Sequence, residues 1–262
     1  MTPNLRELLP DYRVYDIHIH STFSDGNATP DQIAYWAKMH EIGISITDHN
    51  EIRGCLRALE ADVCEVVPGI EVASQQGLDV LAYFEKGEEL ERFYTECLEG
   101  HKGINPSSFT DYDVYDLMKL CRDYGASVVL PHPFWYGRKN WTDELADREK
   151  SIIKLVDGIE CCNSSLPKYL NRRALELAER LNKTYLGGSD SHDISTLASV
   201  VTLVPRDFEG SFLQALHQRL TSVIGYKTPF IRSIYGLTFM AAYHMSYWPK
   251  IIRHRLKGTW HE

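Results

Sequence analysis

Short apolar runs alternate with helical patterns along most of the chain, and this alternation limits the folds that it can adopt. The clearest unit runs from VYDIHI (14–19) to ISIT (44–47), through a helix with Thr29 as its cap, Pro30 in its first turn and Gly43 at its end. Similar runs recur at 63–72, 78–84, 127–132, 157–163, 184–192 and 198–204, with further helical patterns near 53–61, 88–99, 111–124, 168–182 and 209–220. Strands that alternate with helices pair in parallel through crossover connections. About seven such units predict a barrel of the α/β class rather than an open sheet.

The composition is that of a globular protein. Of 262 residues, 44% are hydrophobic and 24% are charged, which is enough apolar material for a sizeable core. The net charge of -8 argues against a general nucleic-acid binder. The six cysteines form no CxxC pair, so reduced thiols are expected rather than a disulfide framework or a zinc ribbon. The N-terminal segment lacks the layout of a signal peptide, so a cytoplasmic location is expected.

Residues 226–262 differ in character from residues 1–225. They carry six basic residues against Glu262 as the only acidic one. Their stretch 233–249 is uncharged but polar and broken by proline, and it falls short of a membrane span of about 20 apolar residues. We expect 1–225 to form the barrel domain and 226–262 to be a basic, aromatic-rich helical extension packed on it. The alternative is an appendage that contacts a membrane surface or nucleic acid.

The stretch DIHIHSTFSDG (16–26) places polar groups where a core strand usually has none. Because side chains alternate along a strand, Asp16, His18 and His20 point to the same face, and Asp25 follows just past a turn. Two imidazoles and a carboxylate on one face pack poorly. Either something is bound there or the strand opens to solvent at this end.

Other unusual polar residues also follow predicted strands. They are His49, Glu71, His132, Asp190 and His192. The carboxyl ends of barrel strands are where such folds assemble active sites. Each of these residues alone is more often a hydrogen-bonded core group or a surface charge, but their joint position after separate strands favours one shared site. No such setting surrounds five other histidines, for which a structural role is preferred: His40, His217, His244, His254 and His261.

Five motifs in this order resemble those of the PHP (polymerase and histidinol phosphatase) family: DIHIHSTFSDG, ITDHN, PGIE, PHP and GSDSH. The resemblance runs from about residue 14 to about residue 205. It implies a distorted (β/α)7 barrel with two or three divalent metal ions, and hydrolysis of phosphate esters.

The resemblance also implies which residues hold the metals. The first metal would be held by His18, His20, Glu71 and Asp190; the second by Glu71 as a bridge and by His132; the third by Asp25, His49 and His192. Mixed imidazole and carboxylate ligands suit manganese, iron or zinc better than magnesium or calcium.

One position departs from the family pattern. Members commonly have a further histidine ligand of the second metal in a strand shortly after the glutamate. Here that strand reads LDVLAYF, with Asp79 in this place, and the sequence has no histidine between 50 and 100. A carboxylate can still donate oxygen to a metal, and His101 from the following loop is an alternative substitute.

Metal ions of this kind supply the chemistry that phosphate-ester hydrolysis needs, because they acidify a bound water and neutralise phosphoryl oxygens. In support of catalysis, Asp16 is expected to orient a ligand histidine, and His192 to combine its ligand role with proton donation to the leaving oxygen. Substrate contacts are expected from Arg138, Lys139 and Asn163, with nearby tryptophans available to stack on a base.

Two classes of function stay open from the sequence. The favoured one is a metal-dependent phosphoesterase acting on a small phosphomonoester, a nucleotide or a short oligonucleotide, with histidinol phosphate as an alternative substrate. The other is a PHP-like scaffold that binds a metal or ligand without turnover, and Asp79 is the feature that supports it. No obligate protein partner is expected.

Overall fold

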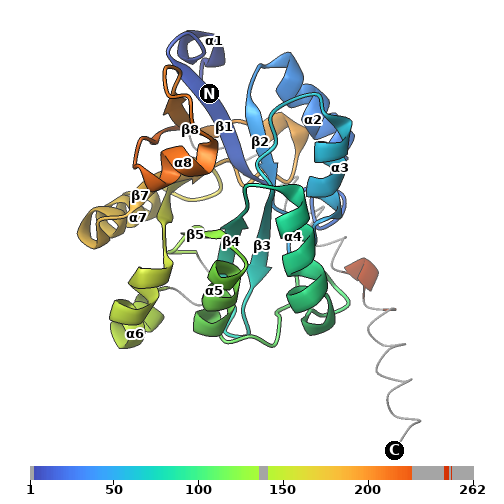
Figure 1. Ribbon diagram of the computed structural model, residues 1–262, viewed down its shortest axis with the longest axis vertical. Helices are drawn as coiled ribbons and strands as arrows, with labels where there is room; N and C mark the ends of the chain where they lie inside the picture. The colour runs from blue at the N-terminus through green and yellow to red at the C-terminus, as the bar shows by residue number, and fades with distance from the viewer. Residues whose placement is uncertain (1–2, 136–140, 226–244, 248, 250–262) are drawn as a thin grey trace, which may run out of the picture.

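The computed structural model describes residues 3–135, 141–225, 245–247 and 249, with strands at the centre and helices around them (Figure 1). The helices are α1 Leu5–Leu8, α2 Pro30–Met39, α3 Arg53–Ala61, α4 Gly87–Phe93, α5 Val114–Asp123, α6 Trp141–Leu155, α7 Lys168–Leu181 and α8 Phe212–His217. The strands are β1 Tyr12–Ile19, β2 Gly43–Ile46, β3 Gly69–Ala73, β4 Asp79–Tyr83, β5 Ser127–Leu130, β6 Gly158–Asn163, β7 Thr184–Gly188, β8 Val200–Pro205 and β9 Ser222–Gly225. The α/β class predicted from the sequence is confirmed.

The strands form two sheets and not the predicted closed barrel. One sheet has the order β2-β1-β8-β9, and the other has the order β3-β4-β5-β6-β7. Single bridges connect the sheets where β2 meets the segment before β3, where His49 meets Glu71, and where the end of β1 meets Ser191. Two separate segments that belong to different sheets are thereby brought together at the carboxyl end of β1.

The prediction of parallel pairing throughout is also wrong. β3 pairs with β4 in antiparallel fashion, as do β4 with β5 and β1 with β8. Only four residues separate the end of β3 from Leu78, and Gly77 adopts a positive φ of 77° in the turn. A parallel crossover needs about a dozen residues, so a connection this short closes a hairpin instead.

Helix α2 shows why the local sequence signals were informative. The Thr29 side chain accepts a hydrogen bond from the backbone N–H of Gln32, the Gln32 side chain accepts from the N–H of Thr29, and Pro30 begins the helix. The predicted cap and first turn are therefore confirmed. Helix α6 is not predicted by the sequence patterns considered above.

Strand β1 runs through the centre of the core. Its residues from Val14 to Ile19 are all buried, so both faces of the strand are covered. Tyr15 and Ile17 belong to one apolar cluster, together with Phe212 of α8, whereas Ile19 belongs to a larger cluster beneath α2 to α7. Asp16 and His18 therefore lie inside the protein rather than at a solvated edge.

In the described part of the chain, no helix combines the length and the apolar character that crossing a membrane requires. Most of the expected C-terminal extension, 226–262, lies outside the described residues, so its packing on the domain stays a prediction.

Candidate metal centre

All nine predicted metal ligands meet at one place in the structure. They form four overlapping groups in which potential ligand atoms lie within 4.8 Å of one another: His18, His20 and Glu71; His18, His132 and Asp190; Glu71, Asp79 and His132; and His20, Asp25, His49 and His192. The groups draw on the carboxyl end of β1 and the turn after it, the middle of β3, the start of β4 and the segments that follow β2, β5 and β7. The convergence expected from strand-end positions is therefore present.

Glu71 lies at the centre of the cluster and is fully buried. Its Oε2 atom is 3.5 Å from Nε2 of His18, 3.4 Å from Nε2 of His20 and 2.9 Å from Nδ1 of His49. Its Oε1 atom is 3.0 Å from Nε2 of His132. One carboxylate thus faces ligand atoms of several groups, which is the arrangement that a bridging ligand requires.

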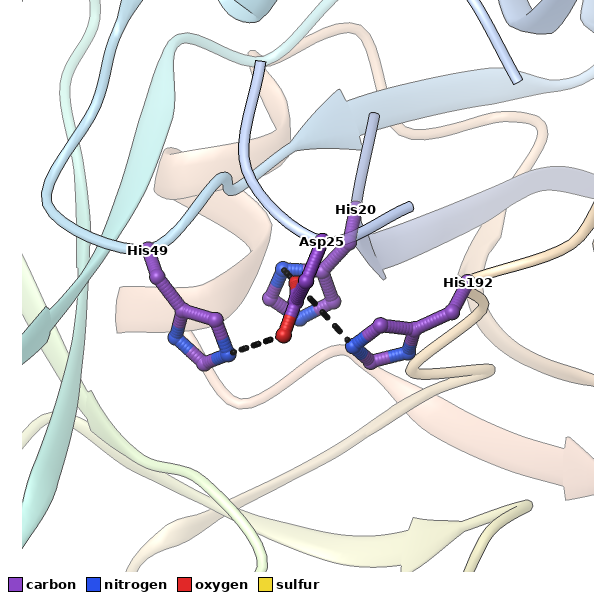
Figure 2. Close-up of side chains that lie close together, drawn as sticks. All are labelled: His20, Asp25, His49 and His192. Atoms are coloured by element: carbon purple, nitrogen blue, oxygen red, sulfur yellow. Dashed lines mark ion pairs between the residues drawn. The ribbon is translucent and has the colours of Figure 1, made fainter. Parts of the chain in front are cut away.

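The group around Asp25 is shown in Figure 2, where the imidazoles of His20, His49 and His192 surround its carboxylate. Asp25 Oδ2 lies 3.6 Å from Nε2 of His49, and Oδ1 lies 3.3 Å from Nε2 of His192. Nδ1 of His192 donates to the backbone oxygen of Asp190 at 3.0 Å, which directs Nε2 towards the group. This backbone contact fixes which imidazole nitrogen faces the cluster.

Asp79 lies in one group of potential ligands with Glu71 and His132. It is buried at the first position of β4, where the family commonly has a histidine. His101 lies elsewhere: its imidazole is half exposed and pairs with Asp111 at 3.0 Å, and it belongs to none of the four groups found among the described residues. The geometry therefore favours Asp79 over His101 as the substitute donor.

The donor atoms of the cluster are suited to binding a cation and make poor hydrogen-bond partners for one another. Buried atoms without a hydrogen-bond partner within the described residues include His18 Nε2, both nitrogens of His20, Asp25 Oδ1, Glu71 Oε2 and His192 Nε2. Each buried polar atom left in this state costs about 1–3 kcal/mol. A divalent cation satisfies these atoms together, and the mixture of imidazole and carboxylate donors suits a transition metal.

Electrostatics shifts the groups of the cluster in both directions. Burial lowers the pKa of His49, but Glu71 and Asp25 outweigh it and raise that pKa to about 9, so a metal ion at this imidazole would displace a proton. Burial alone raises the pKa of Glu71, but His49 and His18 outweigh it and hold that pKa well below its usual range. Burial, with His192 and His49 close by, lowers the pKa of His20 to about 4. The carboxylate is therefore charged and this imidazole neutral at pH 7, as metal ligands must be.

The backbone is strained where it presents these donors. His132 and Asp190 have positive φ angles of 24° and 50°, and Asn50, next to His49, has a φ of 47°. Such conformations cost about 1–3 kcal/mol each in non-glycine residues and cluster at functional sites. Gly188 contributes in a different way, because a Cβ atom there would lie 2.3 Å from Cβ of His18. Glycine thus allows β7 to approach β1 closely.

A buried carboxylate that the sequence analysis missed supports the centre. Glu160 on β6 has Oε1 at 3.0 Å from Nδ1 of His18, and Oε2 accepts from the N–H of His132 at 2.7 Å. The available signal was a single charged residue between Ile159 and Cys161 in an otherwise apolar strand. Glu160 thus orients His18 by the contact that had been expected from Asp16.

Asp16 instead holds the segment that follows β7. Its two carboxylate oxygens accept from the backbone N–H of Ser189 at 2.9 Å and of Ala198 at 2.8 Å. It therefore positions the turn carrying Asp190 and His192. Asp48 holds another turn in the same way. Its carboxylate accepts hydrogen bonds from the hydroxyls of Ser21 at 2.6 Å and of Ser24 at 2.5 Å, which fixes the turn before Asp25.

Of the three predicted substrate-binding residues, Asn163 lies within the described part of the chain and the other two lie outside it. Asn163 is fully buried, and its side-chain amide donates to Glu160 and to Asp190, both at 3.1 Å. It orders these carboxylates, and contact with a substrate stays a prediction. Arg138 and Lys139 lie outside the described residues.

Aromatic and basic side chains lie next to the cluster. The ring of Trp135 is 5.1 Å from that of His132. The guanidinium of Arg173 lies 4.2 Å from the centre of the Phe134 ring, and that of Arg53 lies 4.9 Å from the centre of the Phe23 ring. Phe23 precedes Asp25 by two residues, and Phe134 follows His132 by two residues. The two pairs of arginine and phenylalanine therefore flank different parts of the centre.

Comparison with known proteins gives a family model that matches one segment of the chain and solved structures that share its fold. A family model described as PHP-associated matches residues 168–221. The fold is shared with a two-domain protein of Bacteroides vulgatus that contains a predicted PHP-like metal-dependent phosphoesterase, at 22% identity over 82% of this chain and 66% of that chain, with a TM-score of 0.56. The PHP-associated model matches this one segment, and the shared fold agrees with the resemblance to the PHP family that the sequence motifs carry. The lesion-specific endonuclease of Pyrococcus furiosus also shares the fold of this chain, at 14% identity over 79% of this chain and 56% of that chain, with a TM-score of 0.59.

A curated relative is known only as an uncharacterized protein of Methanocaldococcus jannaschii. It is 27% identical to this chain over 182 residues. The aligned region covers 68% of this chain and 65% of the relative.

Asp79→Ala is expected to remove about one metal equivalent and to lower activity at least about 10-fold, since loss of a supporting group alone costs 10- to 100-fold. The reason is that Asp79 shares a group with Glu71 and His132. Elemental analysis and phosphate release from the same preparation measure both effects. Asp79→His should keep the metal and shift its preference towards zinc or iron. His101→Ala is the matched control, and unchanged metal content in Asp79→Ala would contradict a ligand role.

The cysteines are not expected to take part in the chemistry. All six are free, and burial raises the pKa of the Cys55 and Cys161 thiols to about 12. Iodoacetamide at pH 7 should therefore leave metal content and activity unchanged, because only thiolates react. Mass spectrometry of the treated protein checks the extent of labelling. Loss of activity in step with labelling of any cysteine would refute this expectation.

Proposed function

We propose that this protein is a metal-dependent phosphoesterase that hydrolyses a small phosphorylated substrate, with a nucleotide or short oligonucleotide as the favoured class. The observation that carries the proposal is the meeting of nine imidazole and carboxylate donors in four overlapping groups. Two or three divalent ions of manganese, iron or zinc would be held by these residues. Such ions, when bound, supply an acidified water and neutralise the phosphoryl oxygens.

The chain's own residues hold the site ready for this chemistry. Glu160 and Asn163 fix the orientation of His18 and Asp190 through the buried hydrogen bonds described above. The apolar cover around β1 excludes bulk water from the donors, which strengthens every charge interaction within the centre. His192 is more exposed than His18 and His20, with 14% of its side chain accessible, so it is the best placed of these three imidazoles to meet a substrate. We assign it the proton transfer to the leaving oxygen.

The surroundings of the centre support a substrate with an aromatic part. Trp135 offers a ring for stacking, and the exposed Arg173 offers a guanidinium group for phosphate, whereas the guanidinium of Arg53 already pairs with Glu51 at 2.8 Å. A solved endonuclease Q with the same fold holds a 27-mer duplex with an abasic lesion at its active site, at 14% identity and a TM-score of 0.61. That likeness supports a nucleotide or oligonucleotide over a sugar phosphate.

The structure bears on the scaffold alternative through Asp79. That residue was the one feature in favour of a site without turnover, yet it lies within reach of Glu71 and His132. We infer that Asp79 is a different donor in the place of the usual histidine, so that no ligand is missing there. Six free thiols support the expected cytoplasmic location, because reducing compartments maintain thiols.

The test is a substrate panel on protein whose metals have been quantified. It contains 3′- and 5′-mononucleotides, a dinucleotide, ribose 5-phosphate and histidinol phosphate. Phosphate or nucleoside release should be fastest with a nucleotide or dinucleotide. Trp135→Ala should raise KM for that substrate about 10-fold, since stacking is worth about 1–3 kcal/mol per base. Trp36→Ala, on helix α2, is the matched control. Metal-loaded protein that releases nothing from the whole panel would overturn the proposal.

A further inference from the structure

A second hollow lies at the end of the sheet opposite to the metal centre. It has a volume of about 210 Å³ and is lined by residues at the amino ends of β1 and β2, by the end of α2 and by the segment that follows β8. His18 and His20 come at the other end of β1, so the two sites are separated by the length of that strand. None of the predicted metal ligands lines this hollow.

Three basic side chains line the hollow: Arg13, Lys38 and Arg206. The described residues place no carboxylate in an ion pair with any of them. Arg13 donates from Nη2 to the backbone oxygen of Gly210 at 2.7 Å, and Arg206 donates from Nε to that of Leu9 at 2.6 Å. These contacts fix two guanidinium groups in place without neutralising their charge.

The Nε atom of Arg13 is buried and has no hydrogen-bond partner in the described part of the protein. A buried donor in this state costs about 1–3 kcal/mol, and more when it belongs to a charged group. An anion in the hollow would recover this cost by accepting from the guanidinium. The arrangement is therefore better satisfied with a ligand than without one.

Two carboxylates, Glu41 and Glu65, also line the hollow. The Tyr15 hydroxyl donates to the carboxylate of Glu65, with distances of 2.8 and 2.9 Å to its two oxygens. This hydrogen bond orients the Glu65 carboxylate towards the tyrosine. Glu41 is exposed at the end of α2, where water screens it. Three cations against two carboxylates leave the lining of the hollow with a net charge of +1.

We propose that this hollow binds a compact dianion, either a phosphoryl group or a short dicarboxylate. Arginine presents parallel N–H donors that match both kinds of oxyanion, and lysine adds a point charge. A volume of about 210 Å³ corresponds to about seven water molecules at ~30 Å³ each. Inorganic phosphate or a small dicarboxylate fits in this space, and the site is distinct from the one that would take the substrate.

Cys64 provides a local reporter, because it lines the hollow and is half-buried. Burial raises the pKa of its thiol to about 11, and the same value applies to half-buried Cys162 on β6, which does not line the hollow. In the experiment, metal-loaded protein is alkylated with iodoacetamide at pH 9 and each cysteine is followed by mass spectrometry. Inorganic phosphate and succinate are titrated separately, with sodium chloride at equal ionic strength as the control.

Phosphate is expected to slow alkylation of Cys64 along a saturation curve, by about 10-fold at ten times the midpoint concentration, and to leave Cys162 unchanged. Lys38→Gln and Arg206→Gln, both at exposed positions, should abolish this protection, whereas Arg172→Gln on α7 should retain it. Protection by phosphate alone identifies a phosphoryl ligand, and protection by succinate as well identifies general dianion binding. No protection by either anion, equal slowing of Cys162, or protection retained in both hollow variants would overturn the proposal.

Discussion

Glu71→Gln is expected to lower the rate of phosphate-ester hydrolysis by about 1000-fold, which corresponds to about 4 kcal/mol of lost transition-state stabilisation. Glutamine keeps the size of the side chain but removes the negative charge. Within the part of the chain that the structure describes, Glu71 is the one carboxylate that lies within 3.5 Å of all four imidazoles of His18, His20, His49 and His132. A change at this residue should therefore disturb several ligand groups at once.

Metal content separates this effect from misfolding. The Glu71→Gln protein should lose at least one metal equivalent, as measured by elemental analysis, while its circular dichroism spectrum stays that of the native protein. Glu88→Gln, at an exposed position on α4, is the matched control and should retain both metal and activity. Full activity of Glu71→Gln with native metal content would rule out its role as a shared ligand.

Glu160→Gln should weaken metal binding and activity by about 10- to 100-fold, the usual cost of removing a group that orients a metal ligand. Its carboxylate is buried and contacts the imidazole of His18, the N–H of His132 and the amide of Asn163. Glutamine preserves the volume but replaces one acceptor oxygen by a donor amide. The imidazole of His18 then loses the partner that fixes its orientation.

Competition with a fluorescent chelator measures the metal affinity of this variant, and thermal unfolding of the metal-free protein measures its stability. A role in orienting His18 predicts weaker metal binding even where the midpoint of unfolding is unchanged. A lower midpoint with native metal affinity would show instead that Glu160 only stabilises the fold.

The meeting of the predicted ligands at one place could be foreseen from the sequence, because strand ends converge in space regardless of how the sheets close. His18, His49 and Asp190 each follow or end an apolar run, and the fold brings such ends together beside Glu71 in the middle of β3. The antiparallel pairing of β3 with β4 was harder to foresee. It depends on the short hairpin between these strands, which an apolar pattern alone does not distinguish from a crossover.

The supporting residues could not be assigned because their partners are distant in sequence. Asp16 bonds to Ser189 and Ala198, which follow it by 173 and 182 positions, and Glu160 follows His18 by 142 positions. Side-chain alternation shows which face a residue occupies but not what it meets there. Asp16 was therefore correctly placed inside the protein and given the wrong neighbour.

Metal-dependent hydrolysis is tested most directly by reconstitution. The protein is stripped with a chelator, freed of the chelator, and titrated with manganese, iron or zinc, while bound metal and phosphate release are measured in the same samples. Phosphate release should vanish in the stripped protein and return in proportion to occupancy, with at least two equivalents bound at full activity. Hydrolysis that survives exhaustive stripping, or a protein that takes up none of these metals, would contradict the proposed function.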